Sequence, residues 1–438
     1  MRGWLSSAVL LGFCVAGCAQ VSPATPSSAG LAERVPLLAH AGNERILHRF
    51  QGGRDGYLGE PVLLNLNGTL YGTTQRGGGS SACTNGCGTL YSIASSGSGY
   101  TVLYRFQGGQ DGAIPQAGLT AVGSALYAAT GYGGGASGCV NKYESGCGTV
   151  VSIAPSGKNY RVVYRFKGGN DAALAEGNLA NVNGVLYGLS FSGGASTCTY
   201  SALSGCGTLY AVDTATGKER VVYSLQGGND GAHPVAEPTL LNGTLYGISW
   251  YGGGTGCGGG GCGSIFTWDL SKAKERVLYG FGSGSKGEYP ETNLVPIDGQ
   301  LYGNAANGGA HGMGTVFKTD PTTGKTSIVY SFTGGADGAL PNGGLIAVGN
   351  ELYGVTAYGG GGTCKAGSYV GCGTVFAVST SGVERVVYAF RGGRDGFLPG
   401  NSVLYVDGEL YGTTLLGGGT NCKAPAGSGC GTIFAVKP

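Results

Sequence analysis

One motif recurs seven times in this chain and constrains its fold more than any other feature. Most copies read Phe-x-Gly-Gly-x-Asp-Gly, with Leu for Phe in the fourth copy and no Asp in the fifth. The copies begin at Phe50, Phe106, Phe166, Leu225, Phe281, Phe332 and Phe390, spaced 51 to 60 residues apart. A constant period of this size is the signature of a repeat architecture, in which each copy is one structural unit.

Each unit contains four short segments with strand character and no helical periodicity. In the first unit these segments are 61–66, 69–74, 88–93 and 100–106, and an Asn-Gly hairpin signal separates the first two. Four short antiparallel strands repeated seven times predict an all-β, seven-bladed β-propeller over residues 44–438. A parallel β-helix has shorter coils, and a sandwich does not need seven similar units.

The two ends of the repeat region predict how the ring closes. The last unit lacks a fourth strand, whereas the region begins with an unpaired fourth strand at 44–50. Pairing these two incomplete parts removes an exposed strand edge. We therefore expect 44–50 to lie beside 431–436.

Composition supports a folded body and argues against nucleic acid as a partner. Glycine accounts for 93 of 438 residues, but it alternates with apolar runs that include 26 Tyr and 13 Phe, which suits strands joined by tight turns. The formal net charge is only +2, and the basic residues are scattered. We expect a monomer that does not bind nucleic acid.

The N-terminus has the pattern of an export signal. A positive start precedes an apolar stretch at 5–15, which is too short to span a bilayer. The residues around Cys18 resemble the lipobox of bacterial lipoproteins. This resemblance implies a signal peptide at 1–17, a lipid on Cys18 and, because Ala19 follows, outer-membrane delivery in a diderm host. An ordinary secretory signal is the alternative. The Ala/Ser/Pro-rich segment 18–43 is then a flexible tether.

Twelve of the fourteen cysteines form six local pairs, each in the loop before the third strand. Zinc needs four ligands, but each loop offers only two, and an exported chain meets an oxidising compartment. The fifth unit lacks both cysteines, as a bonded pair predicts, and carries Met313 instead. The predicted disulfides are Cys83–Cys87, Cys139–Cys147, Cys198–Cys206, Cys257–Cys262, Cys364–Cys372 and Cys422–Cys430.

The cysteine loops and the Gly-Gly-x-Asp-Gly links fall on one face of an up-and-down propeller, and loops carry function more often than scaffolds do. That face is therefore the candidate binding face. Residues that break the repeat there could grip a ligand, although packing over the blade tops is the competing interpretation. The candidate ligand-binding residues are Arg76, Tyr132, Trp250, Tyr251, His311 and Tyr358.

The aspartate of the motif recurs in six units. A ring of carboxylates could bind cations, but recurrence in step with the repeat favours aspartates that cap backbone N–H groups in their own turns. These residues are Asp55, Asp111, Asp171, Asp230, Asp337 and Asp395. The Gly-x-Gly-x-x-Gly match at 254–259 opens no helix, and no Gly-x-Ser-x-Gly elbow occurs. We predict no catalytic residue, metal site or cofactor.

The composite unit Leu-Tyr-Gly-Thr-Thr … Gly-Thr-Val-Phe … Leu-Tyr-x-Phe-x-Gly-Gly-x-Asp-Gly-x-x-Pro resembles the GloVer tandem repeat of bacterial "choice-of-anchor" surface proteins. The resemblance covers about 44–438. It implies a surface-displayed repeat protein and offers no catalytic residues to carry over.

Three functions are compatible with the sequence. The favoured one is a lipid-anchored protein of the cell envelope whose propeller is a non-catalytic binding module for a glycan or protein through the cysteine-loop face. A propeller glycosidase or lyase acting on polysaccharide is the main alternative, and a scaffold of an envelope complex is the third. Two carboxylates about 5–10 Å apart in a deep central pocket favour glycoside hydrolysis, whereas a shallow aromatic face without paired acids favours binding.

Overall fold

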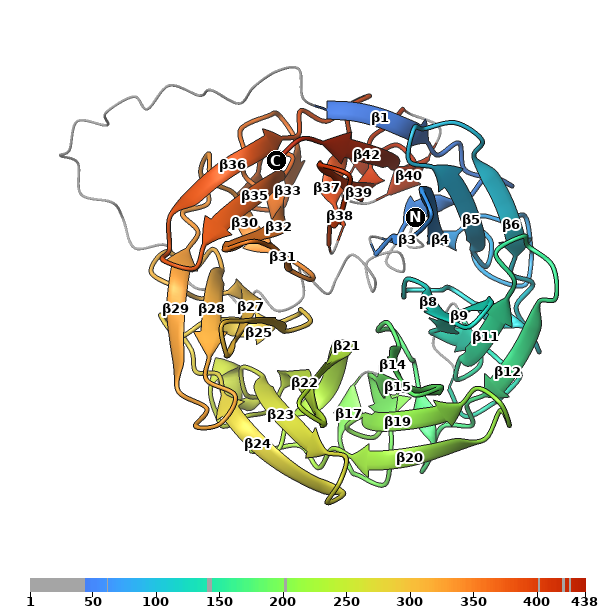
Figure 1. Cartoon of the computed structure of the whole chain (residues 1–438), viewed down its shortest axis with the longest axis horizontal. Coiled ribbons are helices and arrows are strands. Elements are labelled where there is room, and N and C mark those ends of the chain that lie inside the picture. Colours follow the sequence, from blue (N-terminus) through green and yellow to red (C-terminus); the bar gives the residue numbers. More distant parts are fainter. Residues whose placement is uncertain are drawn as a thin grey trace, which may run out of the picture.

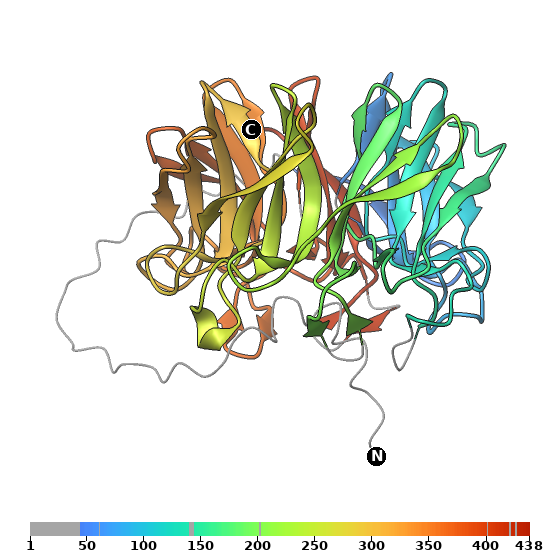
Figure 2. The ribbon, with the colours of Figure 1, turned by 90° about the horizontal axis from the view of Figure 1, so that it is seen from below.

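The computed structural model describes residues 44–60, 62–139, 144–200, 203–400, 402–419, 422–424 and 427–438. Figure 1 shows seven small sheets arranged around an axis, and Figure 2 shows the same ring from the side. The predicted all-β, seven-bladed propeller is confirmed. The signal peptide at 1–17, the lipidated Cys18 and the tether at 18–43 lie outside the described residues. No helix in the described part of the chain has the length and apolar character needed to cross a membrane.

The first blade sets the pattern for the others. Its innermost strand is in two pieces, β2 (Tyr57–Gly59) and β3 (Leu64–Leu66), which both pair with β4 (Thr69–Arg76). The next two strands outward are β5 (Thr89–Ala94) and β6 (Thr101–Arg105), all antiparallel.

The remaining blades repeat this order, with a short hairpin or helical turn added in some cysteine loops. Blade two contains β7 (Gly112–Ala113), β8 (Thr120–Val122), β9 (Ala125–Thr130), β10 (Tyr132–Gly133), β11 (Thr149–Ile153) and β12 (Arg161–Arg165). Blade three contains β13 (Ala172–Ala173), β14 (Ala180–Val182), β15 (Val185–Ser190), β16 (Ser192–Gly193), β17 (Thr199–Tyr200), β18 (Leu203–Ser204), β19 (Thr208–Asp213) and β20 (Glu219–Ser224). Blade four contains β21 (Ala232–Leu241), β22 (Thr244–Tyr251), η1 (Cys257–Gly259), β23 (Ser264–Asp269) and β24 (Lys274–Gly280).

Blades five to seven follow the same plan. Blade five contains β25 (Glu288–Pro290), β26 (Val295–Ile297), β27 (Gln300–Asn307), β28 (Thr315–Thr319) and β29 (Thr326–Ser331). Blade six contains β30 (Ala339–Pro341), β31 (Ile346–Val348), β32 (Glu351–Tyr358), β33 (Lys365–Ala366), β34 (Tyr369–Val370), β35 (Thr374–Ser379) and β36 (Glu384–Ala389). Blade seven contains β37 (Phe397–Pro399), β38 (Leu404–Val406), β39 (Glu409–Leu416), β40 (Lys423–Ala424), β41 (Gly427–Ser428) and β42 (Thr432–Val436).

The ring closes as the sequence predicts. The first strand of the described chain, β1 (Glu44–Arg49), completes blade seven by pairing antiparallel with β42. Ile46 lies opposite Phe434, and Arg49 lies opposite Thr432. Figure 1 shows β1 on the outer side of β42, so an edge that would otherwise be open is covered.

The motif Phe or Leu anchors each blade to the next. Phe332 is fully buried and its ring lies 5.0 Å from that of Phe376 in the following blade, in an edge-to-face arrangement. Gly354 in the second strand leaves room for the ring of Phe376, because a Cβ at Gly354 would come within 2.7 Å of Phe376 Cζ. The motif Phe332 and the glycine Gly354 therefore both lie against the ring of Phe376 on the third strand.

All six predicted disulfides are present. Five of them lie directly under the first glycine of the link that leaves the same blade. At Gly108, for example, φ is +70° and a Cβ would come within 3.0 Å of Cys87 Sγ. In blade five Met313 takes this place below Gly334. Blade five therefore forms the equivalent loop without a disulfide. In the other blades the disulfide stiffens a loop that the fold also forms in its absence.

The recurring aspartates cap their own turns, so that interpretation is confirmed. In each of the six links that carry one, the carboxylate accepts the backbone N–H four residues earlier, over 2.6 to 2.9 Å. A tyrosine on the fourth strand donates a further hydrogen bond to five of them. At Asp55 the neighbouring side chain is His48, at 3.1 Å.

Candidate binding site in the central cavity

A bend in the innermost strand of every blade determines what faces the axis. The sequence predicts one inner strand at 61–66, whereas the structure has only the shorter β3 (Leu64–Leu66) there and a second piece, β2 (Tyr57–Gly59), ahead of the predicted range. A non-glycine residue lies in the left-handed region, with φ between 52° and 55°, eight residues after each motif Phe or Leu. These residues are Leu58, Ile114, Leu174, His233, Tyr289, Leu340 and Leu398.

Such a backbone conformation is rare for bulky side chains and needs support from its surroundings. Here the support comes from the preceding blade. The N–H of Ile114 donates to the carbonyl of Cys87 over 2.8 Å, and the N–H of Leu340 donates to Met313 over 2.9 Å. The same bond forms at all seven positions, so each cysteine loop holds the bend of the next blade.

The bend directs two layers of side chains toward the axis, ten and twelve residues after the motif Phe or Leu. They line a central cavity of about 310 Å³. The first layer comprises Glu60, Gln116, Glu176, Val235, Glu291 and Asn342, and the second comprises Val62, Asn178, Glu237, Asn293, Gly344 and Ser402. Unlike the strands around them, these positions differ from blade to blade.

Four glutamates dominate the chemistry of this cavity, and we refer to Glu60, Glu176, Glu237 and Glu291 as the cavity glutamates. Burial raises the pKa of Glu60, Glu176 and Glu291 to about 8 and that of Glu237 to about 7. The negative charge of Glu176 adds to the rise at Glu60. A carboxyl with such a raised pKa is ionised only in part at neutral pH.

Amide side chains hold some of these carboxyls in place. Gln75 Nε2 donates to Glu60 Oε1. Asn178 Nδ2 donates to Glu237 Oε2 over 3.3 Å, while its Oδ1 accepts the backbone N–H of Gly118 over 2.6 Å. The Trp250 indole beside Glu291 partly offsets the raised pKa of this carboxyl.

Two amide oxygens on the cavity wall have no donor among the described residues. They are Gln116 Oε1 and Asn342 Oδ1, and the Asn342 side chain is only 4% exposed. A buried amide oxygen without a donor costs free energy. These groups are therefore candidates for ligand contacts.

The lining carries no positive charge to balance the glutamates. None of the described residues around the cavity is Lys, Arg or His. Nor do the described residues contain a group of three or more His, Cys, Asp or Glu side chains suited to a metal ion. The cavity can therefore accept hydrogen-bonding ligands that are neutral or positively charged, and it disfavours anions.

Three of the six residues that the sequence singled out lie at or beside this cavity. Trp250 and Tyr358 are part of its wall, each with 1% of its surface exposed. Tyr251 is partly buried, with its ring 4.8 Å from that of Trp250. These aromatics form a wall of the cavity and not an open stacking platform.

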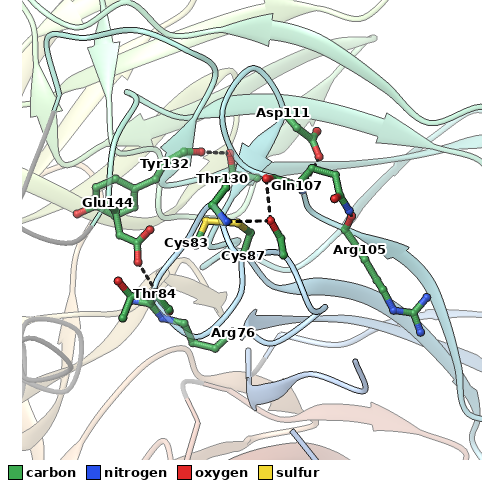
Figure 3. Close-up of a disulfide and its surroundings, with 12 residues drawn as sticks. Arg76, Cys83, Thr84, Cys87, Arg105, Gln107, Asp111, Thr130, Tyr132 and Glu144 are labelled. Carbon is green, nitrogen blue, oxygen red and sulfur yellow. Dashed lines mark hydrogen bonds and ion pairs between the residues drawn. A yellow bond between two sulfur atoms is a disulfide. The ribbon is translucent and has the colours of Figure 1, made fainter. Parts of the chain in front are cut away.

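The other three lie elsewhere. Arg76 is buried, forms an ion pair with Glu144 and donates to the Thr84 carbonyl over 2.7 Å, so its charge is used between the loops of blades one and two. Figure 3 shows this pair below Tyr132, which is 4% exposed. His311 is exposed and does not line the cavity. A ligand-binding role for these residues stays a prediction.

Sequence reasoning missed the cavity glutamates, although a signal for them exists. Counting from each motif Phe or Leu places Glu60, Gln116 and Glu176 at the same tenth position. When the seven copies are aligned on the motif residue, this position is polar in most copies and differs between them, although the strand around it is regular. This variation is the signal that could have indicated the cavity.

The fold and the cavity define a closed seven-bladed β-propeller with an acidic, hydrogen-bonding central cavity. More particularly, the chain belongs to the Gloeobacter/Verrucomicrobia repeat family, whose profile matches residues 36–259 and 144–364. No curated protein matches the chain.

Among solved structures the similarity is one of fold. An oligogalacturonate lyase in complex with manganese shares 13% identity, with 90% of this chain and 89% of that chain covered and a TM-score of 0.50. An oligogalacturonate lyase from Vibrio parahaemolyticus shares 11% identity, with 90% and 93% covered and a TM-score of 0.51. TolB from Acinetobacter baumannii shares 11% identity, with 87% and 80% covered, at a TM-score of 0.36.

Proposed function

We propose that this protein is exported, held at the cell envelope by a lipid on Cys18, and uses its propeller as a non-catalytic binding module. Its ligand is a small polar group without negative charge, such as the terminal sugar of a neutral glycan, and it occupies the central cavity. The six disulfides support an oxidising location outside the cytoplasm.

The observation that carries this proposal is the composition of the cavity wall. Carboxyls and amides supply hydrogen-bond donors and acceptors, while Trp250 and Tyr358 supply apolar surface. Sugars present the same combination of hydroxyls and apolar ring faces. The volume of about 310 Å³ lies at the small end of ligand pockets, roughly 300–1,000 Å³, which suits one or two sugar units better than a long chain segment.

The cavity also agrees with the cysteine-loop face as the side of entry. Gln75, Trp250 and Leu415 line the cavity and stand at the ends of the second strands, where the chain enters the cysteine loops. These positions support entry of the ligand from the cysteine-loop face.

A steric block tests this proposal. Val235→Trp would fill the cavity from an apolar lining position without changing charge. Val383→Trp is the matched control, because Val383 is 70% exposed on the outside. With neutral oligosaccharides as probes in isothermal titration calorimetry, we expect Val235→Trp to weaken binding at least about tenfold, equivalent to 1.4 kcal/mol, and the control to bind like the wild type. Equal binding by both variants, with both folded by circular dichroism, would contradict the proposal.

Glycoside hydrolysis is the second candidate, favoured by one observation. Carboxyls with a pKa near neutrality, as at Glu60 and Glu291, are suited to act as general acids. Two structures of similar fold are named oligogalacturonate lyases, but a uronate would bring negative charge to four glutamates. Release of reducing ends from a neutral polysaccharide, abolished in both Glu60→Gln and Glu291→Gln, would establish an enzyme in place of a binding module.

A further inference from the structure

We propose that the ligand carries a primary ammonium group, on an amino sugar or on a polyamine, and that Glu237 and Glu291 receive this ammonium in the central cavity. This inference rests on the proposed function and specifies the ligand class for the same site. It is carried by three features of the cavity: unbalanced acidic charge, amide oxygens without donors, and glutamates spread over several blades.

The first feature is the charge. The cavity glutamates come from four blades, and none of the described lining residues is basic. Ionising several of them in one small space is unfavourable, because like charges repel and burial removes solvent. A bound cation reverses both costs, since it attracts the ionised carboxylates and replaces part of their lost hydration.

The second feature is independent of the glutamates. Asn342 is more than nine-tenths buried on the cavity wall, and its amide oxygen has no donor among the described residues. Gln116 Oε1 on the same wall also lacks a donor among the described residues, although the residue as a whole is only partly buried. An ammonium group has three donors and no acceptor, whereas a neutral sugar brings both. A wall with surplus acceptors therefore matches an ammonium better than a hydroxyl.

The third feature distinguishes an organic cation from a bare metal ion. Metal ions require several ligands within a short distance of one point, and no such group of His, Cys, Asp and Glu side chains occurs in the described structure. Glu60, Glu176 and Glu291 instead belong to blades one, three and five, around a cavity of about 310 Å³. An extended ligand can contact several of these carboxyls at once.

The raised pKa values give this inference a second measurable consequence. The pKa of Glu237 is about 7 and that of Glu291 about 8, both because of burial. A bound ammonium favours the ionised forms, so binding releases protons and strengthens as pH rises from 6 to 8. A neutral sugar that binds protonated carboxyls shows neither effect.

The experiment is calorimetric titration of the full-length protein in detergent with four probes. These are cadaverine, the glucosamine disaccharide, its N-acetylated counterpart and MgCl₂. Cadaverine serves for the pH series because alkylamines stay charged below about pH 10. Titrations in buffers of different ionisation enthalpy count the protons released. The variants are Glu237→Gln and Glu291→Gln, and the matched control is Glu275→Gln, a glutamate on the outer strand β24 whose pKa burial also raises.

We expect at least one amine probe to bind about tenfold or more tightly than the N-acetylated disaccharide. Protons should be released, and both cavity variants should lose the preference while the control keeps it. Binding of cadaverine alone identifies a polyamine source, and binding of the glucosamine disaccharide alone identifies an amino sugar; each supports the inference.

Other outcomes overturn it. Equal binding of the amine and N-acetylated disaccharides, unaffected by Glu237→Gln and Glu291→Gln, removes the ammonium and leaves the proposed function standing. Competition by MgCl₂ at equal concentration points to a metal site instead. An equal loss in Glu275→Gln removes the cavity as the location. If no probe binds, neutral oligosaccharides included, the inference and the proposed function fail together.

Discussion

Two sets of glutamates in this propeller have similarly raised pKa values and different surroundings. The cavity glutamates line the axis. The rim glutamates, Glu44, Glu219, Glu275 and Glu384, lie on the outermost strands, and burial raises the pKa of Glu44 to about 8 and of the others to about 7. At each rim position the charge of the link aspartate from the preceding blade adds to the rise.

The rim glutamates follow the repeat. Where a blade has Tyr160 at this position instead of Glu, its hydroxyl donates to Asp111. Where the link carries Lys286 and no Asp, the position is Thr326. The rim position therefore carries Glu or Tyr where the link has an aspartate and Thr where it has none. This is expected of residues whose contact joins two blades. The cavity positions differ from blade to blade, and the side chains that contact their carboxyls differ as well, as expected for residues that meet a ligand.

The largest expected effect is a loss of stability with rising pH, to which both sets contribute. Each of the eight carboxyls has a folded pKa above its unfolded value, so its contribution is complete at about pH 4.5 and is lost as pH rises through 7 to 8. The cavity glutamates contribute most of this loss, and the rim glutamates contribute less because solvent screens their charge. The melting temperature, followed by circular dichroism, should fall steadily between pH 5 and pH 9; a flat or rising curve would contradict it.

A smaller effect on stability should distinguish the link aspartates, which contact the rim positions, from the cavity glutamates. Asp111 accepts hydrogen bonds from Tyr104 over 2.9 Å, from the backbone N–H of Gln107 over 2.9 Å and from Tyr160. Asp111→Ala removes the acceptor of all three hydrogen bonds. This variant should lower the free energy of unfolding by about 2–4 kcal/mol, since hydrogen bonds to charged groups are worth about 1.5–3 kcal/mol each before the structure relaxes. Glu176→Gln in the cavity, measured by the same urea titration at pH 7, should not destabilise the protein. Equal losses would erase the distinction between the two sets.

The sequence predicts the ring, its closure and its disulfides because these depend on features that recur. The motif Phe, the paired cysteines and the incomplete unit before Pro438 are each visible without coordinates. The site depends on a feature that local patterns argue against. A left-handed backbone at Ile114 is unfavourable for a β-branched residue, and it is supported by a hydrogen bond to the carbonyl of Cys87 in another blade. Periodicity therefore predicts a continuous inner strand, and the inward direction of Gln116 stays hidden.

The smallest expected effect sharpens the comparison most, because the same substitution is made in both sets. Glu176→Gln in the cavity and Glu219→Gln on the rim each replace a carboxyl that must ionise in a buried place as pH rises. Both variants should be close to the wild type at pH 5 and more stable than it at pH 9, with the larger gain in Glu176→Gln because solvent screens Glu219. The reason is that an amide mimics the protonated acid and does not titrate.

The difference between the two variants should appear only when ligand is present. A saturating amine raises the melting temperature of any protein that binds it in the folded state. Glu219→Gln should keep this rise, because its side chain faces Asp171 and Tyr164 at the rim and not the cavity. Glu176→Gln should lose part of it, because Glu176 lines the cavity. Loss of the rise in both variants would mean that the rim carboxyls also take part in binding, and the repeat would then no longer separate structural from ligand-binding acids.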